Sequence, residues 1–335
     1  MKSAFDQSYS LTMKRQSNSV LIVMNLQPEQ DTEHARHLDT LASDGIDIFL
    51  LARGNLRGAV IHGTHMLNAM RRNHQLGIME SLILGHGYLA TALVGSQLKE
   101  HGRVILSIDC SGPVQGMNVE ATARGEVRGY LKNSTILIEE ELESFDTGPF
   151  IGVGILSLTR HLERQKQPFT GQVLVEYGSI ARDLANYYVQ SEQTPTAFNL
   201  SVQFDAAGRI SGAGGLFVQA IPGAHDEEKE RAQELVEELP SLGRLFADRH
   251  TGADVVHRQF AALEPEIVGT REASFFCACS KERFARFIAG MSDQELDDLE
   301  ANGPFPVTTV CHNCNSTYEF TKAEVHELAA RHRKP

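Results

Sequence analysis

Four of the five cysteines lie in two short groups near the C-terminus, Cys277-x-Cys279 and Cys311-x-x-Cys314, with 31 residues between the groups. Two such pairs brought together give a tetrahedral four-sulfur site, which suits Zn²⁺ in softness, charge and geometry. The second pair has the usual spacing of a zinc knuckle, whereas the single residue inside the first pair requires a tighter bend. We therefore predict that these four cysteines bind one zinc ion per chain.

The cysteine spacing leaves three roles open for this zinc site. Most four-cysteine sites only stabilise a fold, and a catalytic zinc is disfavoured because four thiolates close the coordination shell. In the third role the thiolates are sensors, since zinc keeps them deprotonated and peroxide attacks the thiolate form. Oxidation would then expel the metal. His312, inside the second pair, is an alternative ligand, with an exposed spacer as the preferred interpretation. Cys110 is interpreted as a buried thiol on a strand.

The segment around these cysteines has the pattern of a small α/β module. Ser280 is a candidate helix cap, and Ser292 with Glu295 and Thr321 with Glu324 have capping-box spacing. Short strands are predicted on either side of the second cysteine pair, over Val307 to Val310 and Thr317 to Phe320. A module this small has little core, so the ~10–16 kcal/mol that zinc can contribute to folding would be its main stabilisation.

The chain as a whole is predicted to be α+β, with a larger N-terminal α/β domain, a helical linker and the zinc module. We place an N-terminal extension at residues 1–44, the α/β domain at 45–222, the linker at 223–261 and the zinc module at 262–335. Apolar residues at helical spacing predict an amphipathic helix from about Glu80 to Leu98. Alternation in Phe198, Leu200, Val202 and Phe204, and again from Leu216 to Ala220, predicts a hairpin with one buried face.

The linker stands out by its charge. Between Asp226 and Glu238 it holds seven acidic and two basic residues, with Leu235, Val236 and Leu239 as a thin apolar stripe. We expect it to be helical but to bury little, so that its docking is weak.

Composition disfavours several classes of partner. The 43 acidic against 31 basic residues give a formal charge of −12, which repels phosphate backbones, and the short basic tail from Arg331 to Lys334 is too small to change this. No apolar run is judged long enough for a membrane helix, and Val20 to Met24 is too short for a signal peptide core. We therefore expect a cytoplasmic protein that binds neither nucleic acid nor membrane.

Enzymatic motifs are not evident. The sequence contains no phosphate-binding loop, no complete dinucleotide fingerprint and no legible Ser/His/Asp arrangement. His62 and His65 are three residues apart, as metal ligands can be, but no usable Glu follows them. The sequence thus offers a metal site and redox-capable thiols, with no sign of a substrate pocket.

Together with the cysteines, three further stretches make the chain resemble the heat shock protein 33 family of redox-regulated holdase chaperones. They are Ser191-Glu192-Gln193-Thr194-Pro195-Thr196, Gly214-Gly215 with the strand up to Pro222, and Gly125-Glu126-Val127-Arg128-Gly129-Tyr130. The resemblance covers about Gly45 to Leu328 and does not extend to the first 44 residues.

The resemblance implies an ATP-independent chaperone that binds unfolding client proteins under oxidative or heat stress. Because such a holdase does no chemistry on its clients, we predict a protein that is not an enzyme. It implies that Cys277, Cys279, Cys311 and Cys314 hold zinc when reduced and form two disulfides, each within its own pair, when oxidised. It also implies that release of the linker exposes apolar surface and that the active form is a homodimer. The alternative is a zinc-stapled regulatory module that binds proteins without redox switching. The hairpin face from Phe198 to Phe204 is a candidate client surface, although core is the preferred interpretation.

Overall fold

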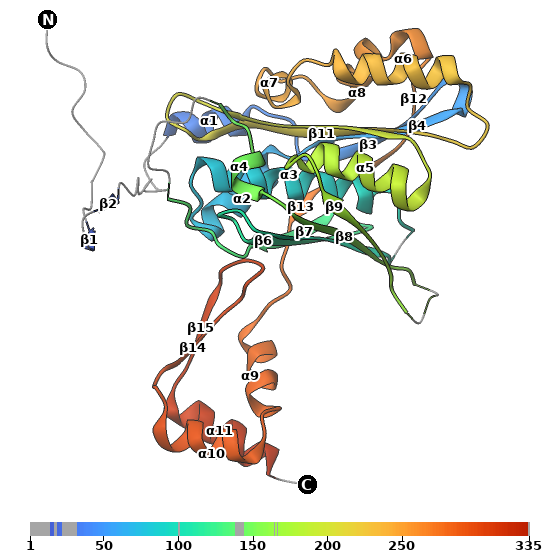
Figure 1. The fold of residues 1–335 in the computed structure, drawn as a ribbon. Helices are drawn as coiled ribbons and strands as arrows, with labels where there is room; N and C mark the ends of the chain where they lie inside the picture. Colours follow the sequence, from blue (N-terminus) through green and yellow to red (C-terminus); the bar gives the residue numbers. More distant parts are fainter. Residues whose placement is uncertain are drawn as a thin grey trace, which may run out of the picture.

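The computed structural model describes residues 14–16, 19–21, 32–99, 101–137, 144–163, 165 and 167–333. Two β-sheets enclose a layer of helices, a second helical layer covers the outer face of one sheet, and a small C-terminal module extends from the opposite side (Figure 1). The predicted α+β class, with its small cysteine-containing module, is confirmed.

The first sheet has five antiparallel strands in the order β10-β11-β4-β3-β12. Its strands are β3 (Gly45–Leu51), β4 (Leu56–His62), β10 (Thr196–Phe204), β11 (Ile210–Ala220) and β12 (Glu266–Glu272). Strands β10 and β11 form the predicted hairpin. The four alternating residues of β10, Phe198, Leu200, Val202 and Phe204, are partly buried against the main core, as preferred over a client surface.

The second sheet has six strands in the order β13-β7-β6-β5-β8-β9 and is antiparallel except for the β13–β7 pair. Its strands are β5 (Arg103–Cys110), β6 (Gly116–Thr122), β7 (Glu126–Leu131), β8 (Gly154–His161), β9 (Phe169–Val175) and β13 (Ser274–Phe275). A short helix, α4 (Gly148–Ile151), precedes β8.

Three helices fill the space between the sheets: α2 (Thr64–His74), α3 (Ile78–Gly95) and α5 (Ile180–Glu192). The sequence predicted that α3 is amphipathic, but every residue except Ile78 and His86 is buried. The reason is that α3 has a sheet on each side, so both of its faces are covered.

Helix α3 also corrects the prediction that no apolar run is long enough for a membrane helix. Within the described part of the chain it is long and apolar enough to span a membrane by length and composition, with a mean hydropathy of 1.3. In the structure 89% of this stretch is buried, as expected for a helix at the centre of a folded domain.

Part of the predicted N-terminal extension forms regular elements, of which one helix contacts the larger domain. Strands β1 (Lys14–Gln16) and β2 (Ser19–Leu21) pair with each other, and α1 (Thr32–Asp39) was not expected from the irregular sequence pattern. The His37 Nε2 atom lies 2.8 Å from the carbonyl oxygen of Ser211. Residues 1–13, 17–18 and 22–31 lie outside the described residues.

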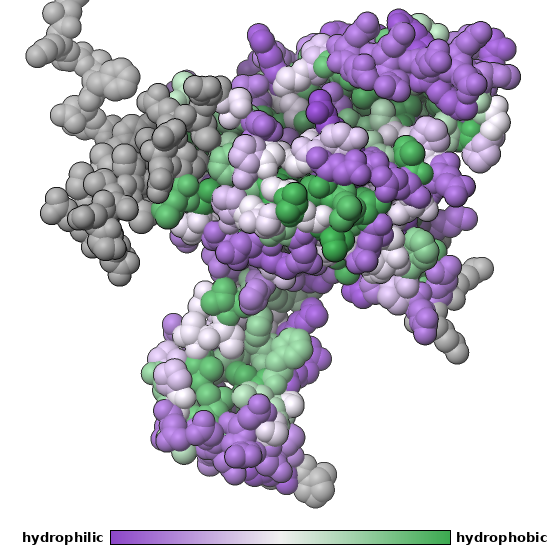
Figure 2. Space-filling model, in the orientation of Figure 1, coloured by the Kyte–Doolittle hydropathy of each residue, from purple (hydrophilic) through white to green (hydrophobic). Residues whose placement is uncertain are grey.

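The linker forms three helices on the outer face of the first sheet: α6 (Asp226–Glu237), α7 (Leu242–Ala247) and α8 (Gly252–Gln259). The expectation that it buries little was wrong. Its apolar side joins β3, β4 and β11 in a separate core, in which Phe246 and Phe260 are completely buried. The thin stripe seen in α6 is only one edge of this core, and the outer face of the layer is hydrophilic (Figure 2).

Glycines bring α7 unusually close to strand β11. A Cβ atom on Gly212 would lie 1.9 Å from the carbonyl oxygen of Gly243, and one on Gly214 would lie 2.1 Å from the Phe246 ring. The Gly243 amide, in turn, donates a hydrogen bond to the Ser201 hydroxyl at 3.1 Å. At these positions, α7 can therefore approach the hairpin only because side chains are absent.

We predict that Gly212→Ala displaces α7 from the sheet, because the new methyl group would collide with backbone that cannot rotate away. Hydrogen–deuterium exchange at residues 242–260 should become faster, while exchange in β5 and β6 stays unchanged. Gly269→Ala in β12 is the matched control, since a Cβ there meets nothing within 4 Å. Equal exchange in the two variants would contradict this account of docking.

A buried histidine lies under the same helix. The His62 ring stacks on Phe246 with ring centroids 4.5 Å apart, and its Nε2 lies 2.8 Å from the Thr64 hydroxyl. Its Nδ1 is buried without a hydrogen-bond partner. Burial, followed by repulsion from His65, lowers the pKa of His62 to about 4. The docked linker therefore requires the neutral imidazole.

We predict that acid weakens linker docking through His62. A histidine whose pKa is lowered on folding stabilises the fold above its unfolded pKa of about 6.5, and this stabilisation is lost as the pH falls towards 4. Opening of α7 should increase about tenfold between pH 7.5 and 5.5. The measurement is hydrogen exchange in α7, corrected for intrinsic rates, and the control is His62→Phe.

The pH dependence must be measured at α7 itself rather than as global stability, because the buried carboxyl of Asp44 also titrates in this range. Burial raises the pKa of Asp44 to about 6, which favours the fold in acid and opposes the effect of His62 on global stability. Asp44 accepts hydrogen bonds from the His65 and Met66 amides of α2 rather than from the linker. If α7 responds to pH equally in His62→Phe, the titrating group is not His62.

The C-terminal module contains α9 (Lys281–Ala289), α10 (Asp293–Asn302), β14 (Val307–Val310), β15 (Thr317–Phe320) and α11 (Lys322–His332). The predicted strand bounds and the caps at Ser280, Ser292 and Thr321 are confirmed. The beginning of the module differs from the prediction, because β12 pairs with β3 and β13 pairs with β7. Residues 266–275 thus extend the two large sheets, and a short 3-10 turn, Ala261–Leu263, connects them to the linker.

Candidate metal centre

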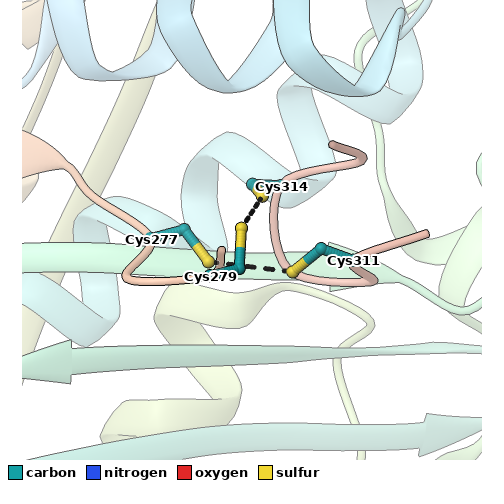
Figure 3. A group of neighbouring side chains, drawn as sticks. All are labelled: Cys277, Cys279, Cys311 and Cys314. Carbon is teal, nitrogen blue, oxygen red and sulfur yellow. Dashed lines mark hydrogen bonds between the residues drawn. The ribbon is translucent and has the colours of Figure 1, made fainter. Parts of the chain in front are cut away.

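The structure brings all four predicted ligands together. The sulfurs of Cys277, Cys279, Cys311 and Cys314 all lie within 4.8 Å of one another (Figure 3). A tetrahedral shell with zinc–sulfur bonds of about 2.3 Å has sulfur–sulfur edges of about 3.8 Å. Two of the sulfur–sulfur contacts measure 3.2 Å, between Cys279 and Cys314, and 3.8 Å, between Cys277 and Cys311. The set therefore fits a four-sulfur zinc shell.

The second cysteine pair forms a tight turn between two strands. The Cys311 carbonyl accepts hydrogen bonds from the Asn315 amide at 2.7 Å and the Cys314 amide at 3.3 Å. Asn315 has a φ of 58°, the left-handed conformation that such a turn requires and that Asn tolerates well. Both sulfurs of this knuckle consequently face inward, and both cysteines are buried.

The first pair approaches from the opposite side, on the segment between β13 and α9. Cys277 and Cys279 are only partly buried, so this side of the cluster is the one that solvent reaches more easily. The tight Cys-x-Cys bend expected from the sequence does place both sulfurs on the same cluster.

The environment of the sulfurs separates their pKa values. Burial raises the pKa of both Cys311 and Cys314. Burial has the same effect on Cys279, but hydrogen bonds from Tyr318 and the neighbouring thiols outweigh it and lower its pKa to about 7. Four thiolates at one point repel each other, so a cation is needed for all of them to be charged at neutral pH.

The module has little else to stabilise it. Among its described residues, the buried apolar cluster has four members, Ile288, Leu296, Phe320 and Val325, with partly buried neighbours around them. A core of this size rarely supports a fold alone, whereas a structural zinc contributes folding free energy directly. The module therefore depends on its sulfur cluster.

Polar side chains contact the sulfurs from outside the ligand set. The Tyr318 hydroxyl lies 3.1 Å from Cys279 Sγ, and the Ser316 hydroxyl lies 3.2 Å from Cys314 Sγ. The Arg128 guanidinium, from strand β7 of the larger domain, donates to Cys277 Sγ at 3.8 Å. Sequence reasoning did not identify these three residues as sulfur partners. The stretch around Arg128 entered the sequence analysis only as one of the motifs that carry the family resemblance.

The knuckle also contacts the larger domain. His74 Nε2, at the end of α2, lies 3.2 Å from the Asn313 carbonyl oxygen, and the Asn315 side chain donates to the Asn73 carbonyl at 3.1 Å. The exposed His312 packs edge-on against the Tyr130 ring, with centroids 5.5 Å apart. The predicted spacer residue is thus a docking contact.

The other candidates lie outside the cluster. Cys110 is at the end of β5 and half-buried, and burial raises the pKa of its thiol. His62 faces the linker rather than a metal site, and the four cysteines are the only metal-ligating group found among the described residues.

Comparison with known proteins agrees with this arrangement. A family described as "Hsp33 protein" matches residues 44–321. The chain belongs to the Hsp33 family. It is 31% identical over 280 residues to the 33 kDa chaperonin of Desulforamulus reducens, covering 83% of this chain and 94% of that one. It is 31% identical over 278 residues to the Bacillus subtilis 33 kDa chaperonin, covering 82% and 94%.

A solved Hsp33 structure has the same fold. The crystal structure of the 33 kDa chaperonin (heat shock protein 33 homolog) from Thermotoga maritima superposes with a TM-score of 0.77 at 30% identity. The superposition covers 87% of this chain and 99% of that chain. This Hsp33 chain, with its four cysteines arranged to fit zinc, thus shares its fold with almost the full length of the Thermotoga maritima protein.

We predict that Cys311→Ser or Cys314→Ser lowers the zinc content of the reduced protein from one ion per chain and loosens the residues after about Cys277. The reason is that the ligand field supplies most of the stability of the module. Metal analysis and hydrogen exchange are the measurements, and Cys110→Ser is the control that should keep its zinc. Substoichiometric metal in the parent protein after zinc-replete expression would argue against the site.

Proposed function

We propose that this protein is a redox-regulated, ATP-independent holdase that binds unfolding proteins after its zinc site is oxidised. The observation that carries the proposal is the cluster of four sulfurs in a module whose own core has four buried residues. Loss of the metal would leave this module without its main stabilisation. Membership of the Hsp33 family, whose relatives are named 33 kDa chaperonins, supports the same function.

The switch chemistry uses the four cysteines as two pairs and hydrogen peroxide as the oxidant. In each pair, one thiolate attacks the O–O bond and becomes a sulfenic acid with release of hydroxide. The other thiolate then attacks that sulfur, which forms the disulfide and releases a second hydroxide. Each pair thereby gives two electrons to one peroxide molecule, and the zinc ion leaves for solvent.

We propose that the disulfides form within each pair, Cys277 with Cys279 and Cys311 with Cys314. The Cys277–Cys311 and Cys279–Cys314 contacts in the folded cluster join different pairs, so they do not favour this pairing. The argument is chain connectivity. Once the module loosens, sulfurs one or two residues apart stay close, whereas sulfurs across the 31-residue segment separate.

The linker is the element that we expect to expose apolar surface. Helices α6–α8 cover a sheet face that includes Phe49, Val60 and Leu216, all completely buried. The zinc module lies on the other side of the sandwich, so it acts on the linker through the intervening strands β12 and β13 (Figure 1). If those strands leave the sheet edges, the linker loses its C-terminal attachment. Its helices can then leave the sheet and expose the apolar sheet face beneath them.

Three functional units follow from this proposal. Residues 45–222 act as the chaperone domain, 223–261 as the releasable linker, and the segment from 262 onward as the redox unit, with 266–275 attaching it to both sheets. Residues 1–44 precede these units. We further propose that the oxidised form is a homodimer and that the protein works in the cytoplasm, where thiols are kept reduced until stress.

The second candidate is a zinc-stapled regulatory module that binds proteins without redox switching. The observation that favours this candidate is the set of four sulfurs, because a closed four-sulfur shell is typical of a purely structural zinc. The same closed shell disfavours a metalloenzyme, because a substrate would find no open coordination position.

We expect peroxide with mild heat to release zinc, form both disulfides and cause the protein to suppress aggregation of a thermally unfolding client. Reduced, zinc-loaded protein should suppress aggregation poorly. Light scattering measures aggregation, a chromogenic chelator measures zinc release, and mass spectrometry maps the disulfides. Cys110 should remain reduced, since its thiol is half-buried with a raised pKa.

The possible outcomes separate the candidates. Equal client protection before and after oxidation supports the regulatory module without a switch. A dominant disulfide between Cys279 and Cys311 would overturn the pairing, although the switch itself would stand. The Gly212→Ala variant, reduced and zinc-loaded, isolates the linker step. If its linker opens and it still shows no gain in client protection, the client surface is elsewhere.

A further inference from the structure

The motif Gly125-Glu126-Val127-Arg128-Gly129-Tyr130 lies on β7, beside the strand that leads into the first zinc ligand. Strand β13 adds to the edge of β7 in parallel, with the Ser274 amide donating to the Gly125 carbonyl at 2.9 Å and the Phe276 amide donating to the Val127 carbonyl at 3.0 Å. This pairing delivers Cys277, the next residue, to the side chain of Arg128.

The first glycine of the motif allows this approach. Gly125 has a φ of 82°, and a Cβ atom there would lie 1.9 Å from the Glu272 carbonyl oxygen. At the other end, the Tyr130 ring contacts His312 of the knuckle. The motif therefore contacts both halves of the sulfur cluster.

Arg128 is held in a defined orientation. Its Nη2 donates to both carboxylate oxygens of Glu120, at 3.1 and 3.2 Å, which leaves Nη1 to donate to Cys277 Sγ. The side chains of Arg128 and Glu120 are only 20% and 17% exposed. A charge in such a place is screened less than one on the open surface.

We propose that Arg128 is a positioning residue for the zinc-thiolate cluster, through which the larger domain controls how tightly zinc is held and how readily the cluster is oxidised. The biological meaning of this inference rests on the proposed redox function. The contact itself concerns only the reduced zinc site, so it can be tested without any chaperone assay.

The physical reason is the charge of the cluster. Four thiolates around Zn²⁺ carry a net charge of −2, and a guanidinium that donates to one of them stabilises that charge. A donated hydrogen bond also withdraws electron density from the sulfur, which lowers its nucleophilicity towards peroxide. Partners of metal ligands typically change metal affinity 10–100-fold when they are removed.

The position of Arg128 makes this effect depend on docking. Cys279 and Cys314 have their outer partners, Tyr318 and Ser316, inside the module itself. Cys277 has Arg128, from the other domain. Separation of β13 from β7, for example by heat, would take the guanidinium away from the cluster. Cys277 would then become the ligand most easily lost and oxidised.

The test uses Arg128→Gln, which removes the charge, and Arg128→Lys, which keeps the charge without the two-pronged geometry. In reduced protein, Arg128→Gln should bind zinc 10–100-fold more weakly in competition with a chromogenic chelator. It should also release zinc faster under excess hydrogen peroxide. Arg128→Lys should lie between Arg128→Gln and the parent.

Two controls separate the sulfur contact from its surroundings. Arg103→Gln removes another arginine near Glu120, at 3.9 Å, and should leave zinc affinity and release unchanged. Tyr130→Ala removes a docking contact without touching a sulfur. The cobalt-substituted proteins then report on the thiolates directly. The sulfur-to-cobalt charge-transfer band should move to longer wavelength in Arg128→Gln and stay in place in Tyr130→Ala.

The inference is overturned if Arg128→Gln keeps the parent's zinc affinity, release rate and cobalt band. It is also overturned if Arg128→Gln and Tyr130→Ala weaken zinc equally with no band shift, because Arg128 would then act only by docking. Failure of the proposed chaperone function would appear differently, as absent client protection after oxidation, and would leave the zinc measurements as they are.

Discussion

Backbone hydrogen bonds along residues 266–275 join the three parts of this molecule. Strand β12 completes the edge of the first sheet and β13 completes the edge of the second, and the linker ends just before them. The first zinc ligand follows directly after them. Along the chain, a change in the zinc module therefore reaches both sheets and the linker through this short segment, beside the direct contacts of the knuckle with α2 and β7. Because β13 pairs over two residues only, it is the weakest point of that attachment.

The sulfur cluster and the linker core differ in how they are stabilised, and that difference suits a switch. The module around the cysteines has a very small apolar core, so its stability depends on ligand bonds that a chemical oxidant can remove. The linker has a substantial apolar core against the sheet, and the close approach of α7 depends on glycines that leave room for it. Oxidation can thus begin in the zinc module, which unfolds at little free-energy cost without its metal. Its effect can then reach the linker, which covers a large apolar face of the sheet.

Local signals in the sequence predicted local structure well. The capping boxes at Ser292 and Thr321, the strands on either side of the knuckle and the β10–β11 hairpin follow from spacing and alternation. Their hydrogen bonds join residues close in sequence or strands connected by a short turn. The same reasoning misjudged α3 and the linker. An apolar stripe shows how much one helix offers for burial, but not how many layers surround it.

By itself, the sequence determined the four-sulfur site, because four clustered thiols have few other uses and each pair needs only a short turn to aim its sulfurs. Tertiary structure alone decided what contacts that site. Arg128 lies 149 positions from Cys277 along the chain and reaches it only because β13 adds to β7. His62 likewise lies under Phe246 only because the linker folds back over β4 and β11. Such pairings depend on strand order and layer packing, which no local pattern of residues encodes.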